Sequence, residues 1–278
     1  MTRKKASTPA PLSIDEKYNL YENSVQTPDL HVKWFDEVFK EHFGRQAHSL
    51  KEDFCGTHWQ SVEWVKMHSK NTALGLDLDP EPIEYGKRTR DVHLTAEQRK
   101  RLKIVQKNVL EPTRPGVDIQ AASNFSFNIF HTRKELKEYF QAAYDSLGKE
   151  GIFILEMAGG TGMMDTMKEK TKITDAQENP WFTYIWKQKD YNYIKNTALY
   201  TISFKMKDGT KYKDVFVYDW RLWTIPEVRE VLEEVGFKST HAYLEDFDDD
   251  GDGDGEYIET EKSDECYTWV GFVVGVKR

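Results

Sequence analysis

The sequence has few of the features that mark secreted, membrane-spanning or nucleic-acid-binding proteins. It contains only two cysteines in 278 residues, too few for a disulfide framework, so we expect a cytoplasmic protein. No apolar run reaches the roughly 18 residues of a membrane helix, and the opening MTRKKASTPAPLS lacks the apolar core of a secretory signal. The net charge of −8 argues against a broad nucleic-acid-binding surface, which requires a basic face. No nucleic-acid or membrane partner is therefore predicted.

What the sequence does contain is a regular alternation of short apolar segments with amphipathic ones. Segments of strand character are expected at 49–54, 73–77, 102–109, 118–125 and 151–157. Helical segments lie between them, one of which opens with the capping box Thr132–Glu135. Strands separated by helices of this length pair in parallel through right-handed crossovers. The predicted fold class is α/β, with a doubly wound, Rossmann-like and mostly parallel sheet.

Residues 181–220 break this pattern, because they are rich in aromatic and β-branched side chains. Tyr200, Ile202 and Phe204 alternate with polar residues, and Asp208-Gly209 supplies a tight turn into a second strand. This segment predicts an antiparallel β insertion. The helix and strand pattern then resumes, with strands expected near 237–244 and 267–276, the last of them antiparallel to the sheet.

The chain is accordingly divided into three predicted parts. Residues 1–29 form an N-terminal tail and lid segment. Residues 30–158 and 218–278 form the Rossmann-like domain, and residues 159–217 form an inserted β subdomain on the substrate side. A helix is expected to begin at Thr27-Pro28-Asp29 and to stop at Gly44.

The turn after the first predicted strand carries the most informative residues. In Leu50-Lys-Glu-Asp-Phe-Cys-Gly-Thr-His58, Gly56 permits a tight turn that places backbone N–H groups and a helix start at the carboxyl edge of the sheet. Asp77 ends the next strand about 20 residues later, where a carboxylate can accept hydrogen bonds from both hydroxyls of a ribose. Taken separately, Gly56 is equally well a simple turn and Asp77 a surface acid. In this order and spacing they predict a nucleoside site.

These residues resemble the first motifs of the class I S-adenosylmethionine-dependent methyltransferases, whose common form is LDLGCGTG. Glu52 takes the acidic place, Cys55-Gly56-Thr57 the centre, and Asp77 the acidic end of the second strand. Two glycines of the common form are replaced by Phe54 and His58. Segments 146–157 and 221–237 resemble the fifth strand and the late helix of the same family.

The resemblance implies S-adenosylmethionine as the cofactor and a set of residues that contact it. Asn108 and Val109 match the pair beside the adenine, and Asn124 and Ser126 fall at the end of the fourth strand, beside the methyl-transfer site. Tyr21 is expected to cap the cofactor from the N-terminal segment. The predicted cofactor-binding residues are Tyr21, Glu52, Phe54, Cys55, Gly56, Thr57, Asp77, Leu78, Asn108, Val109, Asn124 and Ser126.

No catalytic residue is assigned, since methyl transfer from a sulfonium depends mainly on positioning. His131 and Glu156 are possible bases near strand ends, but they are equally well a helix-start residue and a partner of neighbouring backbone. Cys55 is interpreted as a packing residue beside the cofactor. The aromatic residues 181–193 form either an acceptor pocket or the core of the insertion.

The acidic segment 245–261 has the ligand spacing of a calcium loop at Asp250, Asp252, Asp254 and Glu261, but it lacks the flanking helices of an EF-hand. We interpret it as a solvated hairpin loop and assign no metal. The predicted activity is methyl transfer from S-adenosylmethionine to an unidentified small molecule. A nicotinamide-dependent oxidoreductase is the alternative enzyme, although CGTHWQS has one glycine where G-x-G-x-x-G would be needed. A non-catalytic nucleotide-binding relative is the other alternative.

Overall fold

The computed structural model describes residues 10–247, 253–262 and 266–278. Two helices precede the first strand, α1 (Ile14–Val25) and α2 (Pro28–Phe43). As predicted, α2 begins after Thr27 and ends at Gly44, which adopts the left-handed conformation that a glycine tolerates. Helix α1 was not predicted, although Ser13 and Glu16 form a complete capping box that the sequence displays.

The main sheet contains five parallel strands in the order β3-β2-β1-β4-β5, extended by β12, β10 and β11. Strand β12 pairs antiparallel with both β5 and β10, which confirms the predicted antiparallel last strand. The bounds are β1 (Ser49–Asp53), β2 (Thr72–Asp77), β3 (Leu102–Gln106), β4 (Val117–Ala122), β5 (Leu147–Gly159), β10 (Ser239–Phe247), β11 (Gly253–Glu259) and β12 (Trp269–Lys277).

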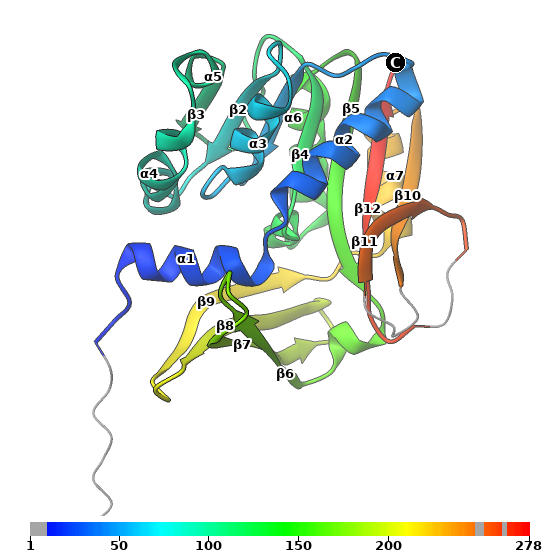
Figure 1. Ribbon diagram of the computed structural model, residues 1–278. Coiled ribbons are helices and arrows are strands. Elements are labelled where there is room, and N and C mark those ends of the chain that lie inside the picture. The colour runs from blue at the N-terminus through cyan, green and yellow to red at the C-terminus, as the bar shows by residue number, and fades with distance from the viewer. Residues whose placement is uncertain (1–9, 248–252, 263–265) are drawn as a thin grey trace, which may run out of the picture.

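Helices cover both faces of this sheet (Figure 1). One apolar layer joins α2 and α3 to the sheet, and the other joins α6 and α7 to its opposite face. The remaining helix bounds are α3 (Trp59–Met67), α4 (Pro80–Thr89), α5 (Ala96–Lys100), α6 (Arg133–Ser146) and α7 (Ile225–Val235), with single 3₁₀ turns at Asp91–His93, Ser126–Ile129 and Thr161–Met164. The doubly wound α/β fold predicted from the sequence is confirmed.

A second, antiparallel sheet lies between β5 and α7 in the chain, in the order β6-β7-β8-β9. Its strands are β6 (Met167–Thr174), β7 (Pro180–Asn192), β8 (Thr197–Met206) and β9 (Lys211–Arg221). The predicted antiparallel insertion and its turn at Gly209 are confirmed. Helix α1 lies across this second sheet, between it and α4 (Figure 1). The division into three domains stays a prediction, and β9 runs across its boundary at residue 217.

The acidic segment differs from the predicted loop, because Gly253–Glu259 forms strand β11 against β10. Its composition, GDGEYIE, favours no strand by itself, so cross-strand pairing decides its conformation. Of the calcium-loop positions, Asp250 and Asp252 lie outside the described residues. Glu261 instead pairs with Arg229 at 2.9 Å. Within the described ranges no group of three or more His, Cys, Asp or Glu side chains is arranged to hold a metal.

Candidate functional site

The turn between β1 and α3 has the backbone conformation of a glycine-rich loop, although only one of the three glycine positions is occupied by glycine. Phe54, Gly56 and His58 all have positive φ, at 54°, 49° and 47°. They occupy alternate positions, as the glycines of the common motif do. A left-handed conformation costs a residue with a side chain about 1–2 kcal/mol. The loop therefore adopts the expected shape at Phe54 and His58 in spite of their side chains.

Contacts of these two side chains offset that cost. The Phe54 ring packs 5.6 Å from that of Tyr139. The His58 imidazole is fully buried, and its Nε2 lies 3.0 Å from a carboxylate oxygen of Asp91. Against the His58 ring lies Gly86 of α4, where an added Cβ would be 2.4 Å from His58 Cε1 and 2.4 Å from the Thr57 carbonyl oxygen. The loop thus depends on a helix residue that has no side chain.

We predict that Gly86→Ala destabilises the protein, since the new methyl group clashes with backbone that cannot move cheaply. Overpacking of this kind costs about 1–3 kcal/mol. Thermal unfolding would show a melting temperature lower by roughly 3–10 °C. Gly148→Ala is the matched control, because its Cβ would meet atoms only at 3.4 Å or more. If both substitutions lowered the melting temperature equally, close packing at Gly86 would not be the cause.

Asp77 lies opposite Gly56 at the carboxyl edge of the sheet. Its Oδ2 accepts a hydrogen bond from the Gly56 N–H at 2.8 Å, and its Oδ1 accepts one from the Asp79 N–H at 2.9 Å. Burial raises the pKa of the Asp77 carboxyl, against the lowering effect of these two bonds. The space where a Gly56 Cβ would lie is open, with no atom within 4 Å. The turn and the acid therefore face each other beside free space, as the sequence predicted.

Glu52 ends on the same edge and caps helix α3. Its Oε2 accepts from the Ser61 N–H at 2.8 Å and from the Ser61 hydroxyl at 2.5 Å. Its Oε1 has no hydrogen bond among the described residues, and Glu52 lines the cavity. Burial raises the pKa of Glu52 to about 7, although the Ser61 bonds act in the opposite direction. The Thr57 hydroxyl is likewise buried without a partner within the described structure.

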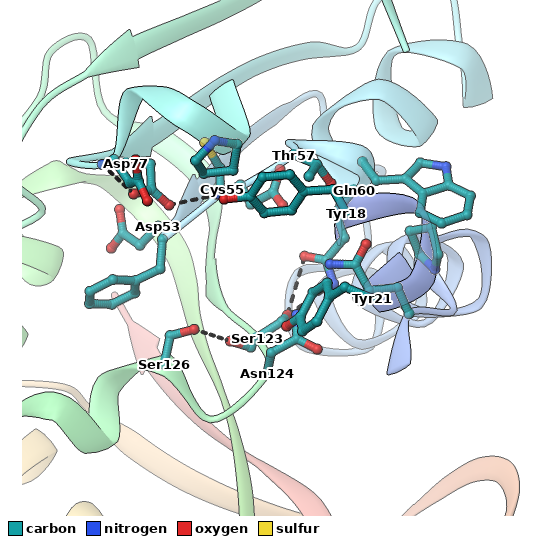
Figure 2. Close-up of a pocket in the computed structure, with 18 of the residues that line it drawn as sticks. Tyr18, Tyr21, Asp53, Cys55, Thr57, Gln60, Asp77, Ser123, Asn124 and Ser126 are labelled. Atoms are coloured by element: carbon teal, nitrogen blue, oxygen red, sulfur yellow. Dashed lines mark hydrogen bonds between the residues drawn. The ribbon is translucent and has the colours of Figure 1, made fainter. Parts of the chain in front are cut away.

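The cavity next to this edge has a volume of about 250 Å³. Figure 2 shows Asp77 and Cys55 on one side of it and Tyr21 and Gln60 on the other. Its walls come from α1, α2, α3, the two loops after β1 and β4, and strand β9 of the second sheet. The Rossmann-like part of the chain therefore supplies most of the cavity walls, and helix α1 and strand β9 complete them.

One wall is a buried polar network. The Gln60 side-chain amide donates to the Ser123 hydroxyl at 3.0 Å and lies 3.0 Å from Nδ1 of His31. The Ser123 hydroxyl in turn lies 3.2 Å from Oε1 of Gln60. These three residues join α2, α3 and the loop after β4 at the cavity.

A second wall is aromatic and belongs to α1 and β9. The Tyr21 ring lies 4.7 Å from that of Phe216, and Tyr218 lines the cavity beside them. Burial raises the pKa of Tyr21 to about 12. A hydroxyl-bearing aromatic wall of this kind can hold the flat face of a small molecule.

Helix α1 is held over the cavity by ion pairs to α4 and its neighbourhood. Lys17 Nζ lies 2.7 Å from a Glu81 oxygen, which also accepts from the Tyr18 hydroxyl at 3.0 Å. Glu22, 1% exposed, pairs with Arg90 and accepts from the Tyr85 hydroxyl at 3.2 Å. The predicted lid segment is thus a helix with its own ionic anchors.

Nine of the twelve predicted cofactor-binding residues line the cavity: Tyr21, Glu52, Phe54, Cys55, Gly56, Thr57, Asp77, Asn124 and Ser126. The other three lie outside it. Leu78 is 61% exposed, Val109 packs in the core, and the Asn108 side chain accepts from the Leu110 N–H. Lining the cavity is not the same as contacting a cofactor, so the assignment of all twelve residues to cofactor binding remains a prediction.

The weaker candidates have other partners. His131 lies just before α6, and its Nε2 is 2.8 Å from the carbonyl oxygen of Asp219 in β9. The Glu156 carboxylate accepts from the Asn124 N–H at 2.6 Å. Neither lines the cavity. Burial raises the pKa of the Cys55 thiol well above its usual value, as suits a packing residue. Among the insertion's aromatics, Phe182, Tyr184, Trp186 and Tyr191 pack in the apolar clusters of the second sheet.

Several cavity residues were missed by sequence reasoning. Phe216 and Tyr218 belong to the alternating pattern of β9, which is visible in the sequence. The pattern alone does not show which face of the strand meets the cavity. Gln60 and Ser123 carry no motif. His31 interrupts the apolar face of α2, which was the one available signal.

No protein-family profile and no curated protein sequence matches this chain. Solved structures do. A sugar N-methyltransferase from Streptoalloteichus superposes with a TM-score of 0.64 at 17% identity, over 100% of this chain and 99% of its own. An amino pentose methyltransferase from Micromonospora echinaspora, solved with S-adenosylmethionine, gives 0.67 at 11% identity over 98% and 100%. An S-adenosylmethionine-dependent methyltransferase from Clostridium acetobutylicum gives 0.64 at 15% identity over 94% and 98%.

The chain therefore has the fold of these methyltransferases along nearly its whole length, including the second sheet. This confirms the fold expected from the motif resemblance. Among the described residues, no helix is both long and apolar enough to cross a membrane.

Proposed function

We propose that this protein is an S-adenosylmethionine-dependent methyltransferase that acts on a small molecule. The observation that carries the proposal is the cavity where Gly56 and Asp77 face each other at the carboxyl edge of a methyltransferase-like sheet. Ligands of open α/β sheets bind at this edge.

The residues present fit the cofactor. Open space beside Gly56 allows a ligand to approach the backbone, and Asp77 supplies a carboxylate for two ribose hydroxyls. The unpartnered Glu52 oxygen and the Thr57 hydroxyl offer an acceptor and a second polar group for an amino-acid moiety. The cofactor supplies a methyl group on a sulfonium, which is already activated for transfer.

The chain's own residues then position the acceptor and exclude water. With the cofactor bound, the acceptor would need an unshared electron pair directed at the methyl carbon, in line with the bond to sulfur. Ser123 and Asn124 border the cavity between the motif side and the Tyr21 side (Figure 2), where an acceptor must lie to attack in line. Closure by α1 and β9 lowers the local dielectric, which favours dispersal of the sulfonium charge.

We propose an amine as the acceptor group. Four acidic residues line the cavity, and because Asp53 is paired with the buried Lys51 at 3.0 Å, the acids that remain for a ligand are Glu52, Asp77 and Asp79. Lys17, the one lysine or arginine among the described lining residues, is already paired with Glu81. A negative cavity attracts a protonated amine, and the aromatic wall can contact it through cation–π interaction. The amine would then give up this proton to solvent, which frees the electron pair that attacks the methyl carbon. The similarity to sugar N- and amino pentose methyltransferases supports the same choice.

No observation favours the nicotinamide-dependent alternative. Two arms of one experiment test the proposal: calorimetric titration with S-adenosylmethionine and with NADH, followed by transfer of a labelled methyl group to amino sugars and to their hydroxyl analogues. We expect binding of the first compound alone and label in the amino sugars. Binding of NADH alone would refute the methyltransferase, and label confined to the hydroxyl analogues would refute the amine.

Cofactor affinity should depend on pH through Glu52. With a pKa of about 7, this carboxyl is mainly protonated at pH 6 and mainly ionised at pH 7.5. If the ionised form accepts from the cofactor's ammonium group, affinity rises by about five- to tenfold over that interval. Calorimetric titrations at the two pH values measure this rise, and Glu52→Gln should abolish it.

The stability of the ligand-free protein should change in the opposite direction. Because burial raises the pKa of Glu52 above its unfolded value of about 4.5, the folded state binds the extra proton between pH 4.5 and 7. This group's contribution to stability therefore falls as pH rises through that window. A melting temperature that falls no more steeply in the native chain than in Glu52→Gln would contradict the buried acid.

A further inference from the structure

The second sheet carries a hollow on the side away from the cofactor cavity, with a volume of about 390 Å³. We name it the lysine hollow, after the residues Lys168, Lys170, Lys172, Lys187, Lys205, Lys211 and Lys213 that line it. They come from β6, β7, β8 and β9, the four strands that form the lower sheet in Figure 1. The lysines of β6 and of β9 occupy alternate positions, and the cross-strand register places Lys187 and Lys205 on the same face. Tyr184, Ile202 and Phe216 belong to the other face.

The charge of the hollow is almost uncompensated. Asp214 lies 3.4 Å from Lys187 Nζ, and it is the acid that pairs with a lysine of the hollow. For the other six lysines, the described residues provide no ion pair. This concentration of positive charge occurs in a chain whose net charge is −8, so it is a local feature and not a consequence of composition.

Two pairs of these lysines are directly opposed. Lys168 faces Lys187 across β6 and β7, and Lys205 faces Lys211 across β8 and β9. Like charges directly opposite on neighbouring strands are destabilising. A ligand with several negative charges would remove this repulsion.

The other lining groups indicate what kind of anion fits. The hollow has hydroxyl groups at Thr183 and Ser203, but its rings are only Phe204, which is fully buried, and Tyr212. Single-stranded nucleic acids require exposed aromatic platforms, and protein partners require large apolar anchors. All its cations are lysines, which act as point charges and not as the planar forks that recognise carboxylates. A compact, highly charged anion matches these features.

We propose that the lysine hollow is a binding site for a compact polyphosphate group, separate from the methyl-transfer site and independent of the function proposed above. Phosphate oxygens would accept from the lysine ammonium groups of all four strands and from the hydroxyls on the floor of the hollow. The contacts are electrostatic, so binding should weaken with added salt.

Titration with inorganic tripolyphosphate, in the presence of saturating S-adenosylhomocysteine to occupy the first cavity, tests this proposal. We expect one site, with affinity reduced by about tenfold or more in Lys205→Glu/Lys211→Glu. The matched control is Lys103→Glu/Lys149→Glu, which makes the same charge change at exposed lysines outside the hollow. No binding, or an equal loss in both double variants, would overturn the proposal. Tighter binding of a 12-nucleotide RNA than of tripolyphosphate would overturn it in favour of a nucleic acid.

The melting temperature supplies a second readout, which tests the opposed lysines without ligand as well as with it. Lys205→Glu alone converts a repulsive cross-strand pair into an attractive one, so the ligand-free melting temperature should rise by about 1–3 °C while tripolyphosphate affinity falls. In the native chain, tripolyphosphate should raise the melting temperature, and it should do so less in the single variant. A lower melting temperature for Lys205→Glu in a correctly folded protein would contradict the opposed-lysine argument.

Discussion

Asp77→Ala should lower the affinity for S-adenosylmethionine by about 100-fold or more while leaving the protein folded. Hydrogen bonds to a charged group are worth about 1.5–3 kcal/mol each, and the substitution removes the acceptor for two ribose hydroxyls. It also removes the acceptor for the Gly56 N–H, which holds the turn at 2.8 Å from the carboxylate. Isothermal titration measures the loss, and circular dichroism checks the fold.

Two comparisons make this result specific. Asp77→Asn keeps the shape and one acceptor oxygen, so its loss of affinity should be intermediate. Asp29→Ala removes an equal charge from an exposed position whose nearest cation is Lys33 at 4.0 Å, and it should leave affinity unchanged. Unchanged affinity in a folded Asp77→Ala would refute the assigned role of this carboxylate.

Lys51→Met should produce the largest loss of stability. Lys51 and Asp53 are fully buried on β1, with Nζ 3.0 Å from Oδ1 in an ion pair that lacks a well-aligned hydrogen bond. The other Asp53 oxygen accepts from Gln120 at 2.5 Å and from the Tyr139 hydroxyl at 2.9 Å. Removing the cation leaves a buried charge, which costs about 3–5 kcal/mol. Chemical denaturation measures the change.

The double variant Lys51→Met/Asp53→Asn should recover most of that stability. It removes both charges and leaves a carbonyl that can still accept from Gln120 and Tyr139, and replacing both members of a buried pair is often nearly neutral. Lys100→Met provides the exposed comparison, because its pair with Glu97 is open to solvent and should contribute little. A double variant as unstable as the single one would show that packing, and not charge, is responsible.

The parts of the fold that follow from local pattern could be predicted from the sequence. The parallel strands, the helix from Thr27 to Gly44 and the turn at Gly209 each have a signal within a few residues. Strand β11 could not be predicted, since it depends on pairing with β10. Helix α1 could have been predicted, because its capping box is present in the sequence.

The residues of the candidate site likewise fall into those that local sequence spacing predicts and those that depend on tertiary packing. Gly56 and Asp77 belong to one strand–helix–strand unit, β1-α3-β2, so spacing was enough to place them together. Gln60, Ser123 and Tyr218 come from three separate elements, and their meeting depends on how α3, the loop after β4 and the second sheet pack. The left-handed backbone of Phe54 and His58 was also hidden, because it is offset by contacts with Tyr139 and Asp91 that are distant in sequence.

A crystal structure of the protein with S-adenosylhomocysteine bound would test the central claim most directly. We expect the ribose hydroxyls within hydrogen-bonding distance of the Asp77 carboxylate, and the sulfur directed toward Ser123, Asn124 and Tyr21. A nucleoside bound elsewhere, or an Asp77 that makes no contact with a saturating ligand, would contradict the account.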